Sequence, residues 1–99
     1  MPRTTQLRRY AVRPERLDAW VTHWRDLVVP LRLEFGFEIQ GGWVDRARSE
    51  HVWVISYEGP ESFDERNAAY WASPQRKAMA LDPSQYLLGE DVRVVEEAL

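Results

Sequence analysis

Six side chains in three short stretches have the chemistry that a binding or catalytic site needs. Together they offer one cation, two phenols, one imidazole and two indole rings, a set that could bind a flat anionic or aromatic molecule and move a proton. In this interpretation His51 is the candidate base and Arg8 is the candidate clamp for an anion. The other four would line the site: Tyr10, Trp43, Trp53 and Tyr57. The alternative is a filled core with a few internal hydrogen bonds, because the sequence alone does not fix which face each side chain takes.

Other kinds of site have weaker support. The only histidines, His23 and His51, are far apart, and the chain has no cysteine, so we expect no metal site and no thiol nucleophile. We find no glycine-rich phosphate loop and no Gly-x-Ser-x-Gly motif. A lone histidine could hold haem iron, but we expect no cofactor and rank haem as the weakest alternative.

The composition of the chain limits the number of domains, the partners and the location that we expect. The chain has 99 residues, of which 44% are hydrophobic and 29% are charged, with a net charge of −3, so we expect one domain over residues 1–99. The mild acidity argues against nucleic acid as a partner. No apolar run is long enough to span a bilayer, and the lack of cysteine is compatible with the cytoplasm, so we expect a cytoplasmic protein without a membrane partner.

A long amphipathic helix over residues 14–36 is the element on which the site residues must pack. Its apolar side chains recur at steps of three and four residues: Leu17, Trp20, Val21, Trp24, Leu27, Val28, Leu31 and Phe35. Arg25, Asp26 and Arg32 fall on the opposite face, which we expect to be solvated. Pro30 predicts a kink or break near Val29, and Gly36 is a typical helix end.

Four strands are predicted, over residues 5–12, 37–45, 51–58 and 90–97. In the second we expect Ile39, Gly41 and Trp43 to share a face, with Gly41-Gly42 marking a bulge or a close backbone approach. In the third, small side chains (52, 54, 56) alternate with large ones (51, 53, 55, 57). We expect the small set to face helices and the large set to face a second covered surface. In the first strand Arg8 lies on one face and Arg9 on the other, so whichever face is covered includes an arginine.

A second helix is predicted from Ser62 to Trp71, because Ser62 and Glu65 have the spacing of a capping box. Ser73-Pro74 begins a further helical segment through Leu81. The resulting order is strand, helix, strand, strand, helix, strand. This order predicts a ferredoxin-like α+β fold, βαββαβ, with a four-stranded antiparallel sheet and both helices on one face. The aromatic second face would pair with another copy, as a homodimeric α/β barrel.

Several segments resemble the NIPSNAP family in their order and spacing: QLRRY (6–10), PERLDAW (14–20), PL (30–31), GF (36–37) and GWV (42–44). The aromatic strand over 51–57 and the helix over 62–71 are similar to that family as well. The resemblance implies a dimeric α/β barrel, in a superfamily that includes small monooxygenases, haem-degrading enzymes and isomerases. The family itself has no established reaction, and its animal members are discussed as adaptor-like proteins.

Two functional hypotheses follow. The first is a homodimeric structural or interaction module, or a module that binds a small hydrophobic or aromatic ligand. The alternative is a cofactor-independent monooxygenase- or isomerase-like enzyme that acts on a small aromatic or polyketide-like substrate inside the barrel. The first rests on the aromatic sheet face, and the second rests on Arg8 and His51.

Overall fold

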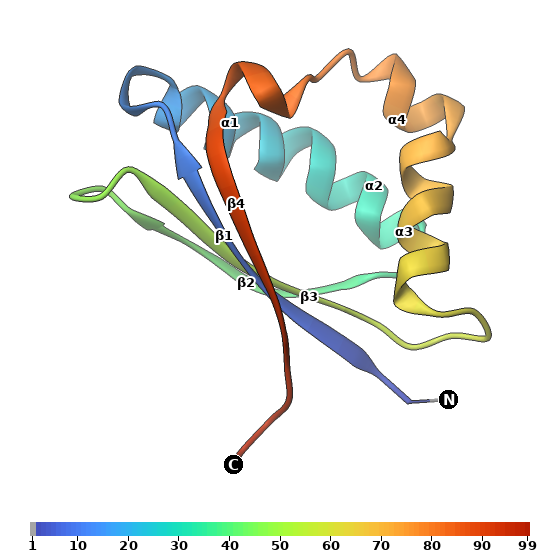
Figure 1. The fold of residues 1–99 in the computed structure, drawn as a ribbon. Helices are drawn as coiled ribbons and strands as arrows, with labels where there is room; N and C mark the ends of the chain where they lie inside the picture. Colours follow the sequence, from blue (N-terminus) through green and yellow to red (C-terminus); the bar gives the residue numbers. More distant parts are fainter. Residues whose placement is uncertain (1) are drawn as a thin grey trace.

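The computed structural model describes residues 2–99 (Figure 1). The sheet contains β1 (Thr4–Val12), β2 (Glu38–Asp45), β3 (Glu50–Tyr57) and β4 (Leu87–Val95). The α-helices are α1 (Leu17–His23), α2 (Val29–Glu34), α3 (Phe63–Ala72) and α4 (Pro74–Ala78). Short helical turns are η1 (Pro14–Arg16), the π-helical η2 (Trp24–Val28) and η3 (Pro83–Gln85). The last strand therefore begins at Leu87 and not at Glu90, because the chain pairs with β1 as soon as it leaves η3.

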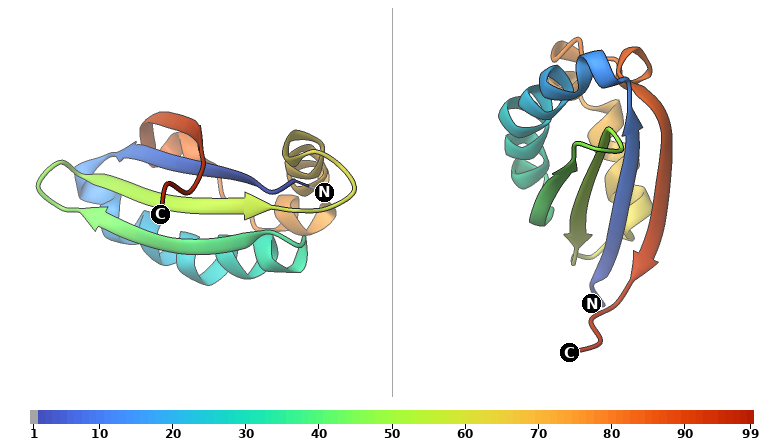
Figure 2. Two further views of the ribbon diagram at one scale, coloured as in Figure 1. Left: turned by 90° about the horizontal axis from the view of Figure 1, so that it is seen from below. Right: turned by 90° about the vertical axis from the view of Figure 1, so that its left-hand side faces the viewer.

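The four strands form one antiparallel sheet in the order β2-β3-β1-β4. All the helices lie on one face of this sheet, and the other face is uncovered in the single chain (Figure 2). The predicted ferredoxin-like βαββαβ fold is confirmed. The helix-covered face holds the core, so any pocket beneath the helices belongs to one chain.

The long helix runs without a break from η1 to α2, but its middle is a π-helical turn. The Val29 N–H bonds to the Trp24 carbonyl, five residues back. Pro30 has no N–H to give, so the wider turn before it accommodates the missing bond. Gly36, with a φ of 87°, ends the helix as expected.

The π-helical turn makes two predictions for this helix wrong. Arg32 was expected on the solvated face, yet only 1% of its surface is exposed. Leu27 was expected in the apolar stripe, yet it is 40% exposed. A π-helical turn holds about one residue more than an α-helical turn, so the residues around and after it are rotated relative to a regular helix. This rotation turns Arg32 toward the sheet.

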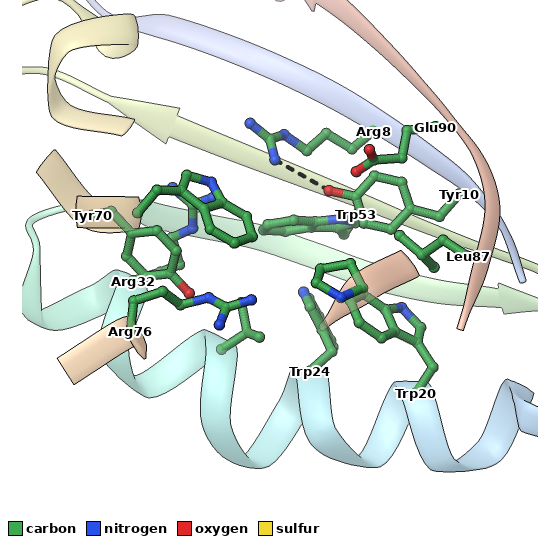
Figure 3. Close-up of a pocket in the computed structure, with 13 residues that line it drawn as sticks. Arg8, Tyr10, Trp20, Trp24, Arg32, Trp53, Tyr70, Arg76, Leu87 and Glu90 are labelled. Carbon is green, nitrogen blue, oxygen red and sulfur yellow. Dashed lines mark hydrogen bonds between the residues drawn. The ribbon is translucent and has the colours of Figure 1, made fainter. Parts of the chain in front are cut away.

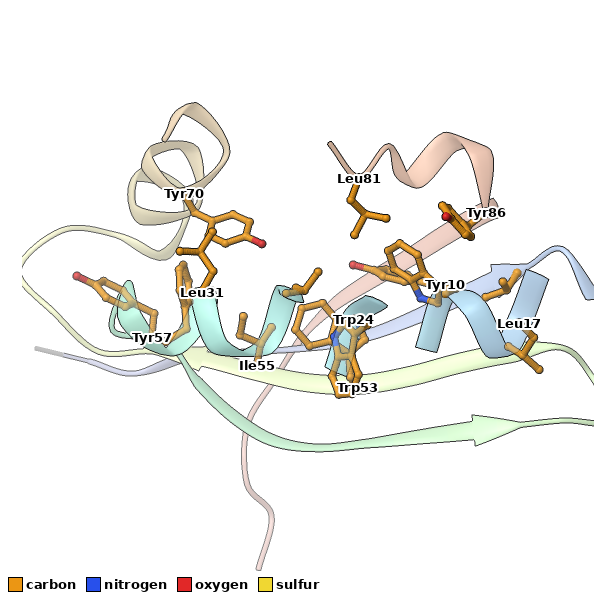
Figure 4. Close-up of a cluster of buried hydrophobic side chains, with 14 of the residues drawn as sticks. Tyr10, Leu17, Trp24, Leu31, Trp53, Ile55, Tyr57, Tyr70, Leu81 and Tyr86 are labelled. Carbon is orange, nitrogen blue, oxygen red and sulfur yellow. The ribbon is translucent and has the colours of Figure 1, made fainter. Parts of the chain in front are cut away.

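The predicted faces of β3 are also wrong. The large side chains of His51, Trp53, Ile55 and Tyr57 are buried beneath the helices, whereas Val52 and Val54 lie half-buried on the uncovered face. The helix layer carries large side chains of its own, including Trp20 and Trp24, and both layers together fill the space (Figure 4). Small side chains on the strand would leave voids there, which a protein core does not tolerate.

The expected bulge in β2 is present, and it makes the predicted shared face wrong. The pairing with β3 shifts between Ile39 and Gly41, so Ile39 pairs with Ile55 and Gly41 with Val54. One extra residue reverses the alternation of the side chains that follow. Trp43 therefore lies on the uncovered face and is 58% exposed. Gly42 faces the helices, where a Cβ atom would collide with the Trp24 ring.

The second helical region begins where predicted, but α4 ends at Ala78 and not near Leu81, because Ala80 takes a left-handed φ of 53°. Ser62 Oγ accepts from the Glu65 N–H at 3.1 Å, and the Glu65 carboxylate accepts from the Ser62 N–H at 3.1 Å, which completes the capping box. Ser73 caps α4 in turn, by accepting from the Arg76 N–H at 3.1 Å. This bond fixes the first turn of α4 and brings Arg76 against the core. Within residues 2–99, no helix combines the length and apolar character needed to cross a membrane.

Candidate functional site: an arginine-lined cleft beneath the helices

A cleft lies between the helix layer and the sheet, near the β4 edge (Figure 3). It encloses about 330 Å³ of empty space including its mouth, and the part open to the centres of water molecules is about 30 Å³. That inner part has room for about two waters, so the cleft is narrow. Thirteen residues line it: Arg8, Tyr10, Trp20, Trp24, Val28, Arg32, Trp53, Tyr70, Trp71, Arg76, Pro83, Leu87 and Glu90.

The walls of the cleft are mainly aromatic rings. The Tyr10 ring lies 6.1 Å from both Trp20 and Trp53, measured between centroids, and Trp24 lies 5.5 Å from Trp53. These three tryptophans are buried, whereas Trp71 is 42% exposed and stands at the mouth. Rigid rings at such spacings give flat surfaces for a flat ligand.

Arg8 and Tyr10 supply the first polar group of the cleft. Both point from β1 toward the helices, two residues apart on the same face. Arg8 donates from Nη1 to the Tyr10 hydroxyl at 3.1 Å, and from Nη2 and Nε to Gln6 Oε1 at 2.9 and 3.1 Å. The Tyr10 hydroxyl accepts this bond and keeps its own proton to donate. Burial raises the pKa of Tyr10, against the opposing effect of Arg8, so Tyr10 is a proton donor at neutral pH.

Arg32, Tyr70 and Arg76 form the second polar group. The Arg32 guanidinium lies 3.8 Å from the centre of the Tyr70 ring, and its Nη1 donates to Asn67 Oδ1 at 2.7 Å. Arg76 lies 4.2 Å from the centre of the Trp71 ring and donates from Nη2 to the Leu81 carbonyl at 3.0 Å. The Nε atoms of both arginines and the Tyr70 hydroxyl are buried without a hydrogen-bond partner. This end of the cleft therefore has donors to spare.

The three arginines of the cleft repel one another. Burial, the charge of Arg8 and, as the smallest of the three causes, the charge of Arg76 lower the pKa of Arg32 to about 10. Arg32 still carries its charge at neutral pH. Glu90 is the one carboxylate in the lining, and it is exposed at the mouth.

His51 is buried behind the cleft and is not part of its lining. Its ring stacks parallel to Trp53, and its Nδ1 accepts from Trp20 Nε1 at 3.1 Å. Burial lowers the pKa of His51 to about 4, so the imidazole is neutral at pH 7 with its proton on Nε2, which has no partner. This geometry favours a role in the core, and the predicted role of His51 as a base stays a prediction.

The structure brings together three of the six predicted site residues as cleft lining, namely Arg8, Tyr10 and Trp53. Tyr57 shares their sheet face but lies farther along β3, where its hydroxyl donates to the Glu61 carboxylate outside the cleft. Trp43 is on the opposite face of the sheet. The roles assigned to the six residues stay predictions, but the geometry does not gather all of them around one ligand.

Sequence reasoning missed Arg32, Tyr70 and Arg76. A usable signal was the spacing of Trp24, Val28 and Arg32, because two steps of four residues place Arg32 at the border of the apolar stripe of a regular helix. No comparable signal marks Tyr70 or Arg76, which depend on the angle between α3 and α4. Within residues 2–99, no three acidic or histidine side chains gather closely enough to hold a metal ion.

Comparison with known proteins identifies the family. The sequence model of the NIPSNAP family matches residues 5–96. The chain belongs to the NIPSNAP family. An uncharacterised NIPSNAP domain protein from Burkholderia xenovorans superposes with a TM-score of 0.80 at 14% identity, covering 96% of this chain and 94% of that one. A NIPSNAP family protein with unknown function from Agrobacterium tumefaciens gives 0.82 at 14% identity, covering 97% and 88%.

A provisionally named antibiotic biosynthesis monooxygenase from Bacteroides thetaiotaomicron has the same fold as this NIPSNAP chain. Its TM-score is 0.73 at 16% identity, and the match covers 98% of this chain and 90% of that one. At such low identity these likenesses show the fold alone. No curated protein sequence matches the chain.

Proposed function

We propose that this NIPSNAP protein binds a small flat aromatic molecule in the cleft between its helices and its sheet. The observation that carries the proposal is the aromatic wall of the cleft with the Arg8–Tyr10 pair set into it. Ligand pockets commonly combine apolar and aromatic walls with a few directional polar groups. The inner part has room for only about two waters, so a single ring fits only when the exposed Trp71 side chain moves aside and widens the cleft.

The five tryptophans provide the test. In an NMR titration with benzamide, a neutral single-ring probe, the indole N–H signals of the cleft residues Trp24, Trp53 and Trp71 should shift. The signal of Trp43, on the other face of the sheet, should stay in place. A ligand with so few atoms should bind with a dissociation constant of roughly 1 mM. No shift, or equal shifts at Trp43 and in the cleft, would contradict the proposal.

A matched pair of variants sharpens this test. Leu87 lines the cleft, and its neighbour Leu88 is 61% exposed outside it. Leu87→Phe should fill part of the cleft and weaken benzamide binding by roughly tenfold, because a filled pocket removes the contacts that hold the ring. Leu88→Phe adds the same ring without filling the cleft, and it should leave the affinity unchanged. Equal effects of the two changes would place the bound probe elsewhere.

The second candidate is the cofactor-independent monooxygenase- or isomerase-like enzyme, and the Tyr10 hydroxyl supports it. This hydroxyl is oriented by Arg8 and has a proton to donate into the cleft. The likeness to the provisionally named monooxygenase is consistent with such chemistry. Proton transfer is a step that both reaction types share.

Deuterium exchange from heavy water into an enolisable single-ring ketone would detect that step. Tyr10→Phe should abolish exchange if Tyr10 is the acid, and His51→Gln should abolish it if His51 is the base. Exchange that survives both changes would remove this candidate's residue assignments. We propose that neither function uses haem, so a hemin spectrum unchanged by the protein is the expected result.

We further propose that two copies pair through the uncovered sheet face. Leu7, Trp43, Val52 and Val54 give that face an apolar centre, and 58% of Trp43 is exposed in the single chain. Light scattering after size-exclusion chromatography should give twice the mass of one chain, and Trp43→Lys should reduce it to one chain. A single-chain mass for the unchanged protein would contradict the dimer. A cytoplasmic location is part of the same proposal and agrees with the lack of cysteine.

A further inference from the structure

The buried arginines of the cleft differ from the arginines that form ion pairs on the surface of this chain. Among residues 2–99, six ion pairs join arginines to carboxylates, and every side chain in them is at least 32% exposed. None of the six includes Arg8, Arg32 or Arg76. These three are 8%, 1% and 5% exposed. The most deeply buried cations of an acidic protein are therefore those without an acidic partner.

An unpaired buried charge is costly, and an arginine cannot lose its proton at neutral pH to escape that cost. Replacement of buried charges by apolar residues of similar volume often increases stability. Three such arginines around one cleft therefore lower the stability of the fold when no anion is bound. Two of them also have an unpartnered Nε. Their arrangement is explained if an anion completes it.

We propose that Arg32, Arg76 and Tyr70 form a carboxylate subsite, so the ligand of the cleft is a single-ring aromatic carboxylate. The inference rests on the proposed binding of a flat aromatic molecule and names its chemical class. The planar guanidinium presents two parallel N–H donors to the two oxygens of a carboxylate. The free Nε of each arginine supplies one donor of such a pair, and the Tyr70 hydroxyl supplies another.

The aromatic neighbours of these arginines fix where the donors point. Tyr70 and Phe37 lie within 3.8 and 4.8 Å of the Arg32 guanidinium, measured to the ring centres, and Trp71 lies within 4.2 Å of that of Arg76. Each guanidinium is also tied by one hydrogen bond, to Asn67 or to the Leu81 carbonyl. Figure 3 shows Arg32, Arg76 and Tyr70 together at one end of the cleft, with Trp24 and Trp53 beside them. A carboxylate there would leave its ring against the tryptophans.

The test compares benzoate with benzamide, which has the same shape and no charge. Benzoate should bind at least roughly tenfold more tightly, because hydrogen bonds to a charged partner are stronger than those to a neutral one. The NMR signals of the Arg32 and Arg76 Nε–H groups should shift with benzoate. Equal affinities would overturn the carboxylate subsite while leaving the proposed function intact. Failure of both probes to bind would contradict the proposed function itself.

Substitutions test which arginines cause the preference for benzoate over benzamide. Arg32→Met and Arg76→Met should each remove most of the preference for benzoate over benzamide. A cooperative thermal unfolding transition shows that each variant is folded. Arg32→Lys keeps the charge but not the paired donors, and should restore only part of the preference. Arg16→Met is the matched control, since Arg16 stacks 4.2 Å from the Tyr86 ring outside the cleft lining. An equal loss in that control would overturn the assignment.

Inorganic phosphate is the remaining comparison. It carries more charge than benzoate but has no ring to stack on Trp24 or Trp53. It should compete with benzoate only weakly, with at least a roughly tenfold higher inhibition constant at about 0.15 M salt. Competition by phosphate at equal or lower concentration than benzoate would overturn the carboxylate class and indicate a general anion site.

Discussion

The two ends of the space beneath the helices differ in how they treat buried polar groups. At one end, the imidazole of His51 is neutral and accepts a hydrogen bond from Trp20, among packed aromatic rings. At the other end, Arg32 and Arg76 keep their charges beside the cleft without an ion-pair partner in the part of the chain that the structure describes. A buried group that can become neutral is compatible with a core. Buried groups that cannot become neutral, and are left unpaired, are typical of a site.

The largest expected effect is at the filled end. Trp20→Ala removes a buried ring that packs on Tyr10 and Tyr86 and donates to His51. We expect the free energy of unfolding to fall by about 3 to 5 kcal/mol, the usual range for deletion of a large buried aromatic side chain. Urea denaturation measures it. A loss below about 1 kcal/mol would mean that this end is not well packed, and the comparison would fail.

The next effect depends on pH. Burial lowers the pKa of His51 to about 4 in the folded chain, from 6.5 in an unfolded one, so the unfolded state binds more protons between these values. The free energy of unfolding therefore has its full value above about pH 6.5. It falls by about 3 kcal/mol in total as the pH drops toward 4. The matched variant His51→Gln keeps a hydrogen-bond acceptor but does not titrate. The difference in unfolding free energy between the two proteins should therefore vary over this pH range; a constant difference would show that His51 is not buried.

At the cleft end we expect a substitution to increase the stability of the fold and not to decrease it. Arg32→Met removes a buried charge and replaces it with an apolar side chain of similar length, so we expect stability to rise by about 1 to 2 kcal/mol without ligand. Thermal unfolding measures the change. If the variant instead loses more than about 1 kcal/mol, then the contacts of Arg32 with Asn67 and Tyr70 outweigh its burial, and Arg32 belongs to the core.

The smallest expected change in stability follows from breaking a surface ion pair of an arginine. Arg46 bonds to Asp18 at 3.1 Å, with 68% and 83% of the two side chains exposed. Asp18→Asn should change the free energy of unfolding by less than about 0.5 kcal/mol, because solvent and salt screen exposed pairs. Chemical denaturation in low and high salt measures it. A large effect would mean that surface pairing, and not burial, distinguishes the arginines of this chain.

Much of the fold could be predicted from the sequence because its signals are local. Ser62 and Glu65 predict a helix start, Gly36 predicts a helix end, and the order of elements leads to the ferredoxin-like topology. The face of β3 could not be predicted, because either alternating set of side chains suits a covered surface. The thickness of the helix layer, filled by Trp20 and Trp24, decides between them.

The site was predicted only in part for a related reason. Arg8, Tyr10 and Trp53 share one sheet face, and a strand pattern keeps such residues together. A regular helix places Arg32 at the border of the apolar stripe, where its charge predicts solvent, whereas the π-helical turn rotates it toward the sheet. Arg76 comes to the cleft through the packing of α3 and α4, which joins residues that no sequence period relates.

The π-helical turn at Trp24–Val28 gives the long helix one residue more than an uninterrupted α-helix would need to span the same distance. Removal of a single residue from this turn would rotate the following segment by about 100° and advance it by about 1.5 Å. The guanidinium of Arg32 would then leave the cleft, although no side chain of the cleft had been substituted. Alignments of this chain with relatives that have a regular helix therefore require a one-residue gap inside the helix, and without it they would pair Arg32 with the wrong position.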